Sequence, residues 1–357
     1  MESIFKDQIK VELPAQEMIT QKKWQQIVLL VMLGFEAAGA LLGGVLLLAS
    51  PDGRYLDMPV DMMHGTFRDF LIPGIILFAL GLLNAAAFFT ILLKSSNGWI
   101  MAVLAIGGLA VWFIVEIAIL QELHWLHFAW GLPVYIGGLA TIPLLPLPYT
   151  KIRNALLLCG IISSLLYISG DLLASWWYDG YSIVDQNYSE LLATGAPTRA
   201  KMLLASIFYN LLVTSFAVGI WISASPKHIA RITSAMMTGY ATLSMVTPAF
   251  FQMDMRGTEV TPLGSLHPHM TVVMSLFILL TIGFGAFLFR KRFRLYSLLS
   301  IIILIVFGVL TSAQVPQLAS GQPTTWMGLT ERVNIYATMT WFAVLSIMLL
   351  REEKKQA

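Results

Sequence analysis

Charged residues are scarce in this chain of 357 residues: Asp, Glu, Lys and Arg together make up 12% of it, about half of the roughly 25% that is typical of soluble domains. The hydrophobic set accounts for 57% of the residues, and the mean hydropathy is +0.75. So few charges cannot coat a water-soluble globule, and the apolar residues come in long runs. The composition excludes an ordinary soluble protein and predicts a membrane protein.

Cysteine and net charge are also low. Cys159 is the one cysteine, so the chain forms no intramolecular disulfide and no cysteine-based metal centre. The formal net charge is +2, which is too small for a nucleic-acid binder, because such proteins carry a strongly basic patch. The sequence contains no nucleotide-binding loop, catalytic serine elbow or zinc-protease motif. We therefore expect no cofactor and no nucleic-acid partner.

Ten apolar stretches are long enough, or nearly long enough, to cross a bilayer, which needs about 20 residues per helix. They lie near residues 27–49, 70–93, 99–120, 126–148, 155–175, 202–224, 232–251, 267–289, 295–313 and 331–350. The fourth is the least regular because of its prolines, and the seventh is expected to end at Pro248. The sequence thus predicts an all-α, polytopic transmembrane helical bundle of about ten spans.

The distribution of Lys and Arg predicts the sidedness of these spans. If the N-terminus is cytoplasmic and the spans alternate, sixteen of the 22 Lys and Arg residues fall on the cytoplasmic side. The positive-inside rule then favours a cell-membrane protein with both termini in the cytoplasm. The outer connections are longer and more polar. Because connections carry function more often than the helices they join, we expect any site near the outer face.

A proline-rich stretch and a basic turn near residues 149–154 divide the predicted spans into two groups. Residues 1–150 form a four-span half, and residues 151–357 form a six-span half. No internal repeat relates the two halves, so the inverted-repeat design of many transporters receives no support.

An acidic side chain, Glu36, lies in the middle of the first span. An ionisable group at that depth is costly and is a functional hypothesis by default. Its neighbours are small, and Gly39 and Gly43 let another helix approach closely. Asn84, at a comparable depth in the second span, is a candidate partner. Two interpretations stay open. Glu36 is either a proton or cation site, or a protonated carboxyl that forms a hydrogen bond inside a tight helix pair. The second is favoured, because one carboxylate without another makes a poor ion path.

Polar residues cluster at the ends of the later spans. The candidate site consists of Asp171, Tyr181, Ser189, Glu190, Arg199, Asp254, His267, Glu331, Arg332 and Asn334. Arg332 opposes the dipole of the last helix, so we expect it to have an acidic partner among Asp171, Glu190 and Asp254. Glu331, Asn334 and Thr338 share one helix face, which is expected to point into the bundle. His267 and His269 point to opposite sides of a helix start, so no metal site is predicted.

Several short motifs in the second half resemble those of the domain of unknown function 998 family. They are Gly180-Tyr181-Ser182, Ser189-Glu190-Leu191, Gly195-Ala196-Pro197, Gly264-Ser265-Leu266-His267 and the stretch from Gly328 to Tyr336. The resemblance covers about residues 155–350. It implies a six-span membrane architecture and the importance of these residues, but it implies no reaction, because the activity of the family is not established.

Three functional hypotheses follow from these residues. In the first, a non-enzymatic membrane protein carries an outward-facing, buried cluster of ion pairs and binds a membrane lipid or a small molecule. In the second, a membrane-embedded lipid hydrolase or transferase uses His267, oriented by Glu190 or Asp254, and Arg332 binds phosphate or an oxyanion. In the third, a secondary transporter uses Glu36. Whether the chain is an enzyme stays open, and its catalytic residues are unknown.

Overall fold

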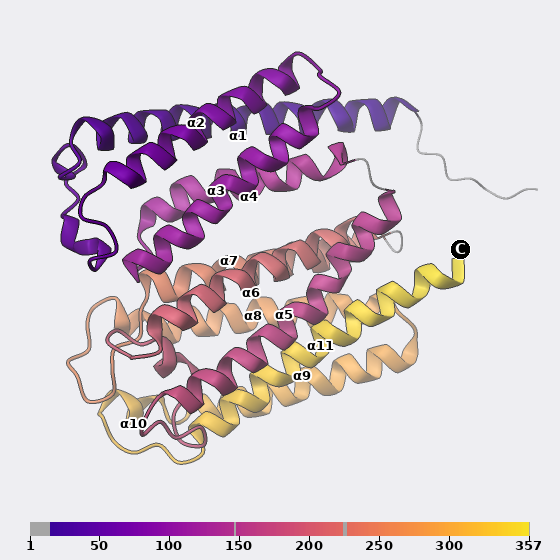
Figure 1. The fold of residues 1–357 in the computed structure, drawn as a ribbon. Coiled ribbons are helices and arrows are strands. Elements are labelled where there is room, and N and C mark those ends of the chain that lie inside the picture. The colour runs from indigo at the N-terminus through magenta and orange to yellow at the C-terminus, as the bar shows by residue number, and fades with distance from the viewer. Residues whose placement is uncertain (1–14, 146–147, 224–226, 357) are drawn as a thin grey trace, which may run out of the picture. The chain divides into compact units, whose positions relative to one another are not determined.

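A computed structural model describes residues 15–145, 148–223 and 227–356 of the chain (Figure 1). Within these ranges every regular element is a helix. Ten long helices correspond to the ten predicted stretches, and eight of them are long and apolar enough to cross a membrane. The chain is therefore an all-α, multi-pass membrane protein. Lys6 and Lys10, which entered the prediction of sidedness, lie outside the described residues.

The two helices that miss the criteria for a span are α4 and α7. Helix α4, Trp125–Thr141, has only 17 residues and gives way to a 3-10 turn at Ile142–Leu144. Helix α7, Lys227–Phe250, is long enough, but its Ser and Thr side chains lower its hydropathy. The prediction that this helix ends at Pro248 was wrong. A proline in the last turn removes one N–H donor and leaves the preceding turns intact, so α7 runs on to Phe250.

The chain divides into two compact units. The first unit is Met1–Leu120 with His124–Pro146, and the second unit is Gln121–Leu123 with Leu147–Ala357. The first unit holds α1 to α4, and the second unit holds the other six long helices.

Four helices form the first unit: α1 (Ala15–Ala49), α2 (Leu71–Leu92), α3 (Gly98–Leu120) and α4. Helices α1 and α3 each pack against both α2 and α4. Glycines bring α1 and α2 into backbone contact. A Cβ atom added at Gly44 would lie 2.7 Å from the backbone of Phe78, and one added at Gly81 would lie 2.7 Å from the backbone nitrogen of Leu41. Small residues thus bring α1 and α2 together, although the backbone contacts lie at Gly44 and Gly81, whereas the predicted Gly39 lies against the ring of Trp130 on α4.

Six helices form a closed ring in the second unit. They are α5 (Tyr149–Trp177), α6 (Arg199–Trp221), α7, α8 (His267–Gly285), α9 (Lys291–Ser312) and α11 (Met327–Gln356). Each packs against the next in this order, and α11 packs against α5 (Figure 1). The short helix α10, Val315–Ala319, precedes α11. The first and last helices of the unit are therefore neighbours.

Buried aromatic and small polar side chains hold the ring together. Trp341 of α11 is fully buried and donates its Nε1–H to Oγ of Ser297 on α9, at 3.0 Å. The Ser164 hydroxyl of α5 donates to the carbonyl oxygen of Met339 at 2.8 Å. Interhelical hydrogen bonds of this kind support helix association where all surroundings are apolar. These two bonds hold α11 against α9 and α5.

Three loops cover one end of the ring, and we call them the cap: residues 178–198, 251–263 and 313–326. The first contains a 3-10 helix, Tyr188–Leu192. The N–H of Thr194 donates to the carbonyl oxygen of Met253 at 2.9 Å, so the first two loops are joined through their backbones. Figure 1 shows the three loops together at one end of the second unit.

The contact between α1 and α2 yields a test of the fold. Replacing Gly44 with alanine forces a Cβ atom against the Phe78 backbone, so we expect the free energy of unfolding to fall by about 1–3 kcal/mol. Thermal unfolding in detergent micelles measures the change. Gly107→Ala on α3 is the matched control, because a Cβ atom there meets open space. Equal stability of the two variants would contradict this packing.

Candidate functional site

The last helix positions the central arginine of the site. Helix α11 begins at Met327, four residues before the predicted start, because Trp326 adopts a left-handed backbone conformation with φ 64° and its N–H donates to Asp185 of the cap. Arg332 therefore lies more than one turn inside the helix, and its side chain faces α5. It is only 3% exposed to solvent.

Arg332 forms a bidentate ion pair with Asp171 of α5. Its Nε–H donates to Oδ2 at 3.0 Å and its Nη2–H donates to Oδ1 at 2.9 Å. Asp171 is completely buried, and the Tyr336 hydroxyl also donates to its Oδ2, at 2.6 Å. Of the three acids considered from the sequence, Asp171 is the partner of Arg332. A paired, hydrogen-bonded charge is the form in which an ionised group tolerates burial.

The other N–H groups of Arg332 hold the first cap loop. Nη2–H donates to the hydroxyls of Tyr181, at 2.9 Å, and Ser175, at 3.3 Å. Nη1 donates to three carbonyl oxygens, those of Ile183 at 2.8 Å, Gln186 at 3.0 Å and Gly328 at 3.3 Å. A guanidinium has five N–H donors, and all five are used. Arg332 is thus saturated by protein acceptors.

Tyr181 links the arginine to the loop backbone. Its hydroxyl accepts from Arg332 and donates to the carbonyl oxygen of Asn187 at 2.6 Å. Burial raises the pKa of the Tyr181 phenol, although the positive charge of Arg332 opposes the increase. The phenol therefore keeps its proton at neutral pH and can serve as donor and acceptor at once.

A second ion pair, between Arg256 and Glu190, joins all three cap loops. Nη2 of Arg256 donates to Oε1 of Glu190 at 2.8 Å, and Nε donates to Oε2 at 3.2 Å. The same guanidinium donates to the carbonyl oxygen of Gln322 at 3.1 Å and to the Thr324 hydroxyl at 3.0 Å. Glu190 is 3% exposed. Its carboxylate also accepts from the N–H of Asn187 at 3.1 Å, which caps the 3-10 helix.

Gln186 connects the two ion pairs. Its carbonyl oxygen accepts from Arg332, and its side-chain Nε2–H donates to Oε2 of Glu190 at 3.0 Å. Glu331, the residue before Arg332, accepts the backbone N–H of Tyr188. The cap, the end of α5 and the start of α11 are thus joined by one hydrogen-bonded network. We call this network the polar lock: Asp171, Tyr181, Gln186, Glu190, Arg256, Glu331, Arg332 and Tyr336.

The other predicted site residues make contacts apart from the polar lock. Nδ1 of His267 is 2.7 Å from the carbonyl oxygen of Phe251. Asp254 accepts from the N–H of Thr261 at 2.8 Å, and Arg199 donates to the carbonyl oxygen of Leu192. Asn334 donates to the carbonyl oxygen of Leu304 at 2.9 Å. Ser189 is partly buried in the 3-10 helix. The structure therefore gathers Asp171, Tyr181, Glu190, Glu331 and Arg332 into one network.

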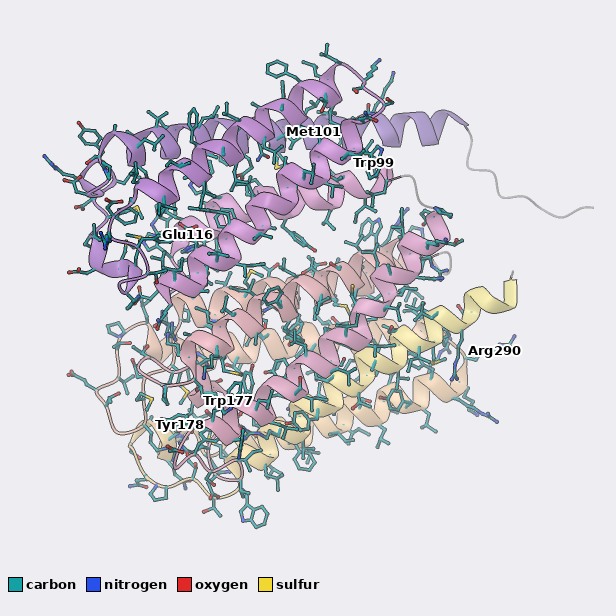
Figure 2. All side chains as sticks on the ribbon, viewed as in Figure 1. Trp99, Met101, Glu116, Trp177, Tyr178 and Arg290 are labelled. Carbon is teal, nitrogen blue, oxygen red and sulfur yellow. The ribbon has the colours of Figure 1, made fainter. Side chains whose placement is uncertain are left out.

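Sequence reasoning left Arg256, Gln186 and Tyr336 out of the candidate site. Arg256 carried a signal, since it is one of the few basic residues in the outer connections. Tyr336 closes the last motif by which the chain resembles the family. No feature of the sequence indicated Gln186, because one of its two contacts in the network is made by its backbone carbonyl oxygen. Figure 2 labels Trp177 and Tyr178, where α5 ends and the first cap loop begins.

The described part of each unit contains a cavity. The cavity in the second unit has a volume of about 10 Å³ and is lined by Tyr167, Tyr188 and Tyr209 among others. That is about the size of one water molecule. The cavity in the first unit is larger, about 250 Å³, and is lined by Gln26, Ile91, Lys94, Ser95, Ser96, Trp99 and Leu144. Glu36 also lies in the first unit, on α1, and is 2% exposed.

The saturation of Arg332 predicts a large stability effect. Asp171→Asn leaves a buried guanidinium without its counter-charge, so we expect the free energy of unfolding to fall by about 3–5 kcal/mol. Arg332→Lys should also destabilise the protein, because an ammonium group cannot form the bidentate pair or supply five donors. Thermal unfolding followed by tryptophan fluorescence measures both variants.

The matched control for these variants is Arg54→Ala. Arg54 and Asp52 also form an ion pair, but their side chains are 79% and 51% exposed. Exposed pairs contribute little to stability, so this variant should unfold at the wild-type temperature. If Asp171→Asn were as stable as Arg54→Ala, the polar lock would not be holding the second unit together.

Comparison with known proteins identifies the family of the chain. A profile of the family described as Protein of unknown function (DUF998) matches residues 161–348. The match covers more than half of the chain and contains every residue of the polar lock. No curated protein and no solved structure matches the chain. The family resemblance predicted from the motifs is confirmed, and the chain belongs to the DUF998 family.

Proposed function

We propose that this chain is a non-catalytic integral protein of the cell membrane that binds membrane lipid, with its outward-facing end closed by the cap. The observation that carries the non-catalytic part is the saturation of Arg332, whose five N–H groups all donate to protein acceptors. To bind a phosphate or an oxyanion, Arg332 would have to give up contacts to Asp171 or to the cap. The polar lock therefore acts as a structural closure.

The hydrolase alternative gains little from the contacts of His267. Its Nδ1 contacts the Phe251 carbonyl oxygen, whereas the hydrolase needs a carboxylate to orient the ring. The carboxylate of Asp254 accepts hydrogen bonds from Thr261 instead. The cavity in the second unit holds about one water molecule and is not lined by His267. These contacts support a histidine that fastens a loop.

The transporter alternative rests on Glu36. Its side chain is 2% exposed and lines neither of the two cavities described above. A transport path needs a polar route by which the substrate reaches the buried group. The packing around Glu36 offers no support for such a route.

The cavity in the first unit supports the binding of a lipid headgroup. One ammonium group, two hydroxyls and an amide line it, from Lys94, Ser95, Ser96 and Gln26, and Trp99 adds an aromatic ring. Lys attracts anionic headgroups, and Trp prefers the headgroup level of a bilayer. The chemistry fits the phosphate of an anionic phospholipid.

Two further observations support the proposed orientation. Sixteen of the 22 Lys and Arg residues fall on the side of the predicted cytoplasmic connections. The end of α5, beside the cap, carries an aromatic residue that suits an interface: Trp177, whose ring lies 4.5 Å from Nζ of Lys201. Both termini are then cytoplasmic, and the cap faces outward.

Lipid binding is tested by native mass spectrometry of the full-length protein released from membranes. We expect Lys94→Ala to retain roughly fivefold less anionic phospholipid, since one Lys near an anionic surface contributes about 1 kcal/mol. Lys291→Ala is the control, because Lys291 is exposed on α9 and lines neither cavity. Arg332→Lys should lose stability and keep its lipid. A ligand lost from Arg332→Lys, but kept by Lys94→Ala, would overturn the proposed function.

Sidedness is tested with single cysteines in a Cys159→Ser background. A membrane-impermeant maleimide added to intact cells should label Thr258→Cys, in an exposed part of the cap, and should spare Ser96→Cys, in the exposed turn before α3. Permeabilised cells should label both. The reverse pattern in intact cells would show that the proposed orientation is inverted.

A further inference from the structure

Two buried oxygen atoms in the first unit lack a hydrogen-bond donor. Oε1 of Glu36, on α1, is one, and Oδ1 of Asn84, on α2, is the other; neither has a partner among the described residues. Glu36 is 2% exposed and Asn84 is fully buried. The amide Nδ2 of Asn84 is engaged, since it donates to the carbonyl oxygen of Leu80 at 2.9 Å. Buried polar atoms without partners are rare, so each one calls for an explanation.

The packing of α1 on α2 places these two side chains at the same depth. A Cβ atom added at Gly34 would lie 3.5 Å from the ring of Phe88, and one added at Gly81 would lie 2.8 Å from the Leu41 side chain. The helices are therefore antiparallel, with a register that puts the carboxyl and the amide within about one turn, or 5.4 Å, of each other along the pair. Both unpartnered oxygens thus lie at nearly the same level of the α1–α2 pair.

Among the described residues of the first unit, the helices around Glu36 bring no Lys or Arg near enough to balance a negative charge on it. Helices α2, α3 and α4 contain no Lys or Arg. On α1, Lys23 lies thirteen residues away, which corresponds to about 20 Å. The titratable groups of the helices packed against α1 are Glu116 on α3, and His127 and Tyr135 on α4, with His124 as the cap of α4. The 3-10 helix Arg54–Leu56, which follows the end of α1, adds Arg54 and Tyr55, eighteen and nineteen residues along the chain from Glu36. An ionised Glu36 would therefore be a buried charge without a counter-charge.

We propose that Glu36 and Asn84 form a proton-binding site, in which the carboxyl keeps its proton and donates it to Oδ1 of the amide. One proton turns the carboxyl oxygen from an acceptor into a donor, so a single hydrogen bond provides for both unpartnered atoms. A metal cation fits less well. Hard cations such as Ca²⁺ take six to eight oxygen ligands, and the described residues contain no group of three or more His, Cys, Asp or Glu that could hold a metal ion.

The proposed proton also contributes to helix packing. It joins α1 to α2 at the point where glycines already bring the two backbones together. Loss of the proton would leave a charge and an amide oxygen facing each other in an apolar contact. The site therefore differs from the polar lock of the second unit, where charges are retained because each is paired.

Infrared difference spectroscopy of the full-length protein in lipid tests the proposal. The spectrum of the wild type minus that of Glu36→Gln should contain the C=O stretch of a protonated carboxyl at neutral pH. Asn84→Leu, which keeps the side-chain volume but removes the acceptor, should shift this band. Carboxylate bands in the difference spectrum would overturn the proposal, and so would a band that Asn84→Leu leaves in place.

A second measurement uses wild-type protein and does not depend on how the variants fold. Dicyclohexylcarbodiimide is an apolar reagent that reacts with protonated carboxyls in membranes. The O–H of the carboxyl adds across one C=N bond, and the O-acylisourea formed rearranges to an N-acylurea, so that the peptide gains one whole reagent and loses nothing. We expect peptide mass spectrometry to find the adduct on Glu36, whereas a water-soluble carbodiimide should not label it. Absence of the apolar adduct on Glu36 would contradict the proposal.

Discussion

The buried ion pair between Asp171 and Arg332 is the interaction on which the second unit depends. It joins α5 to α11, the first and last helices of a ring of six, and thereby closes the ring at its capped end. Taking two charges out of water is expensive, and their attraction repays the cost only when geometry is good and the remaining donors are satisfied. Both conditions are met here, because the pair is bidentate and every N–H of Arg332 has an acceptor.

The same arginine explains how an irregular loop can lie against the end of a membrane bundle. Backbone groups at that depth need partners from the protein, since hydrocarbon supplies none. Arg332 provides donors to the carbonyl oxygens of Ile183 and Gln186, and Glu331 accepts the N–H of Tyr188. Gln186 also donates a hydrogen bond to Glu190, which in turn pairs with Arg256. The segments by which the chain resembles the DUF998 family thus contain residues that hold the cap in place.

Sequence patterns predicted the helices well and their partners only in part. Hydropathy is a local property, so ten apolar stretches were recognisable without knowledge of packing. The sequence also predicted that Arg332 has an acidic partner, but three acids fitted that prediction equally well. Asp171 is the partner because α11 packs against α5, and the sequence does not show that contact. The pair of Arg256 and Glu190 depends on three loops meeting. The partner of His267 is the backbone carbonyl oxygen of Phe251. Every residue has such a carbonyl, so the sequence could not indicate this contact.

The most direct test of this account is backbone hydrogen exchange in the cap of the full-length protein. In the wild type, the amides of Tyr188, Glu190 and Leu329 should exchange slowly, because each donates to an acceptor within or beside the polar lock. In Arg332→Lys these amides should exchange much faster, while those of the α1 and α2 helices keep their rates. Slow exchange that persists in Arg332→Lys would contradict the claim that this ion pair holds the cap.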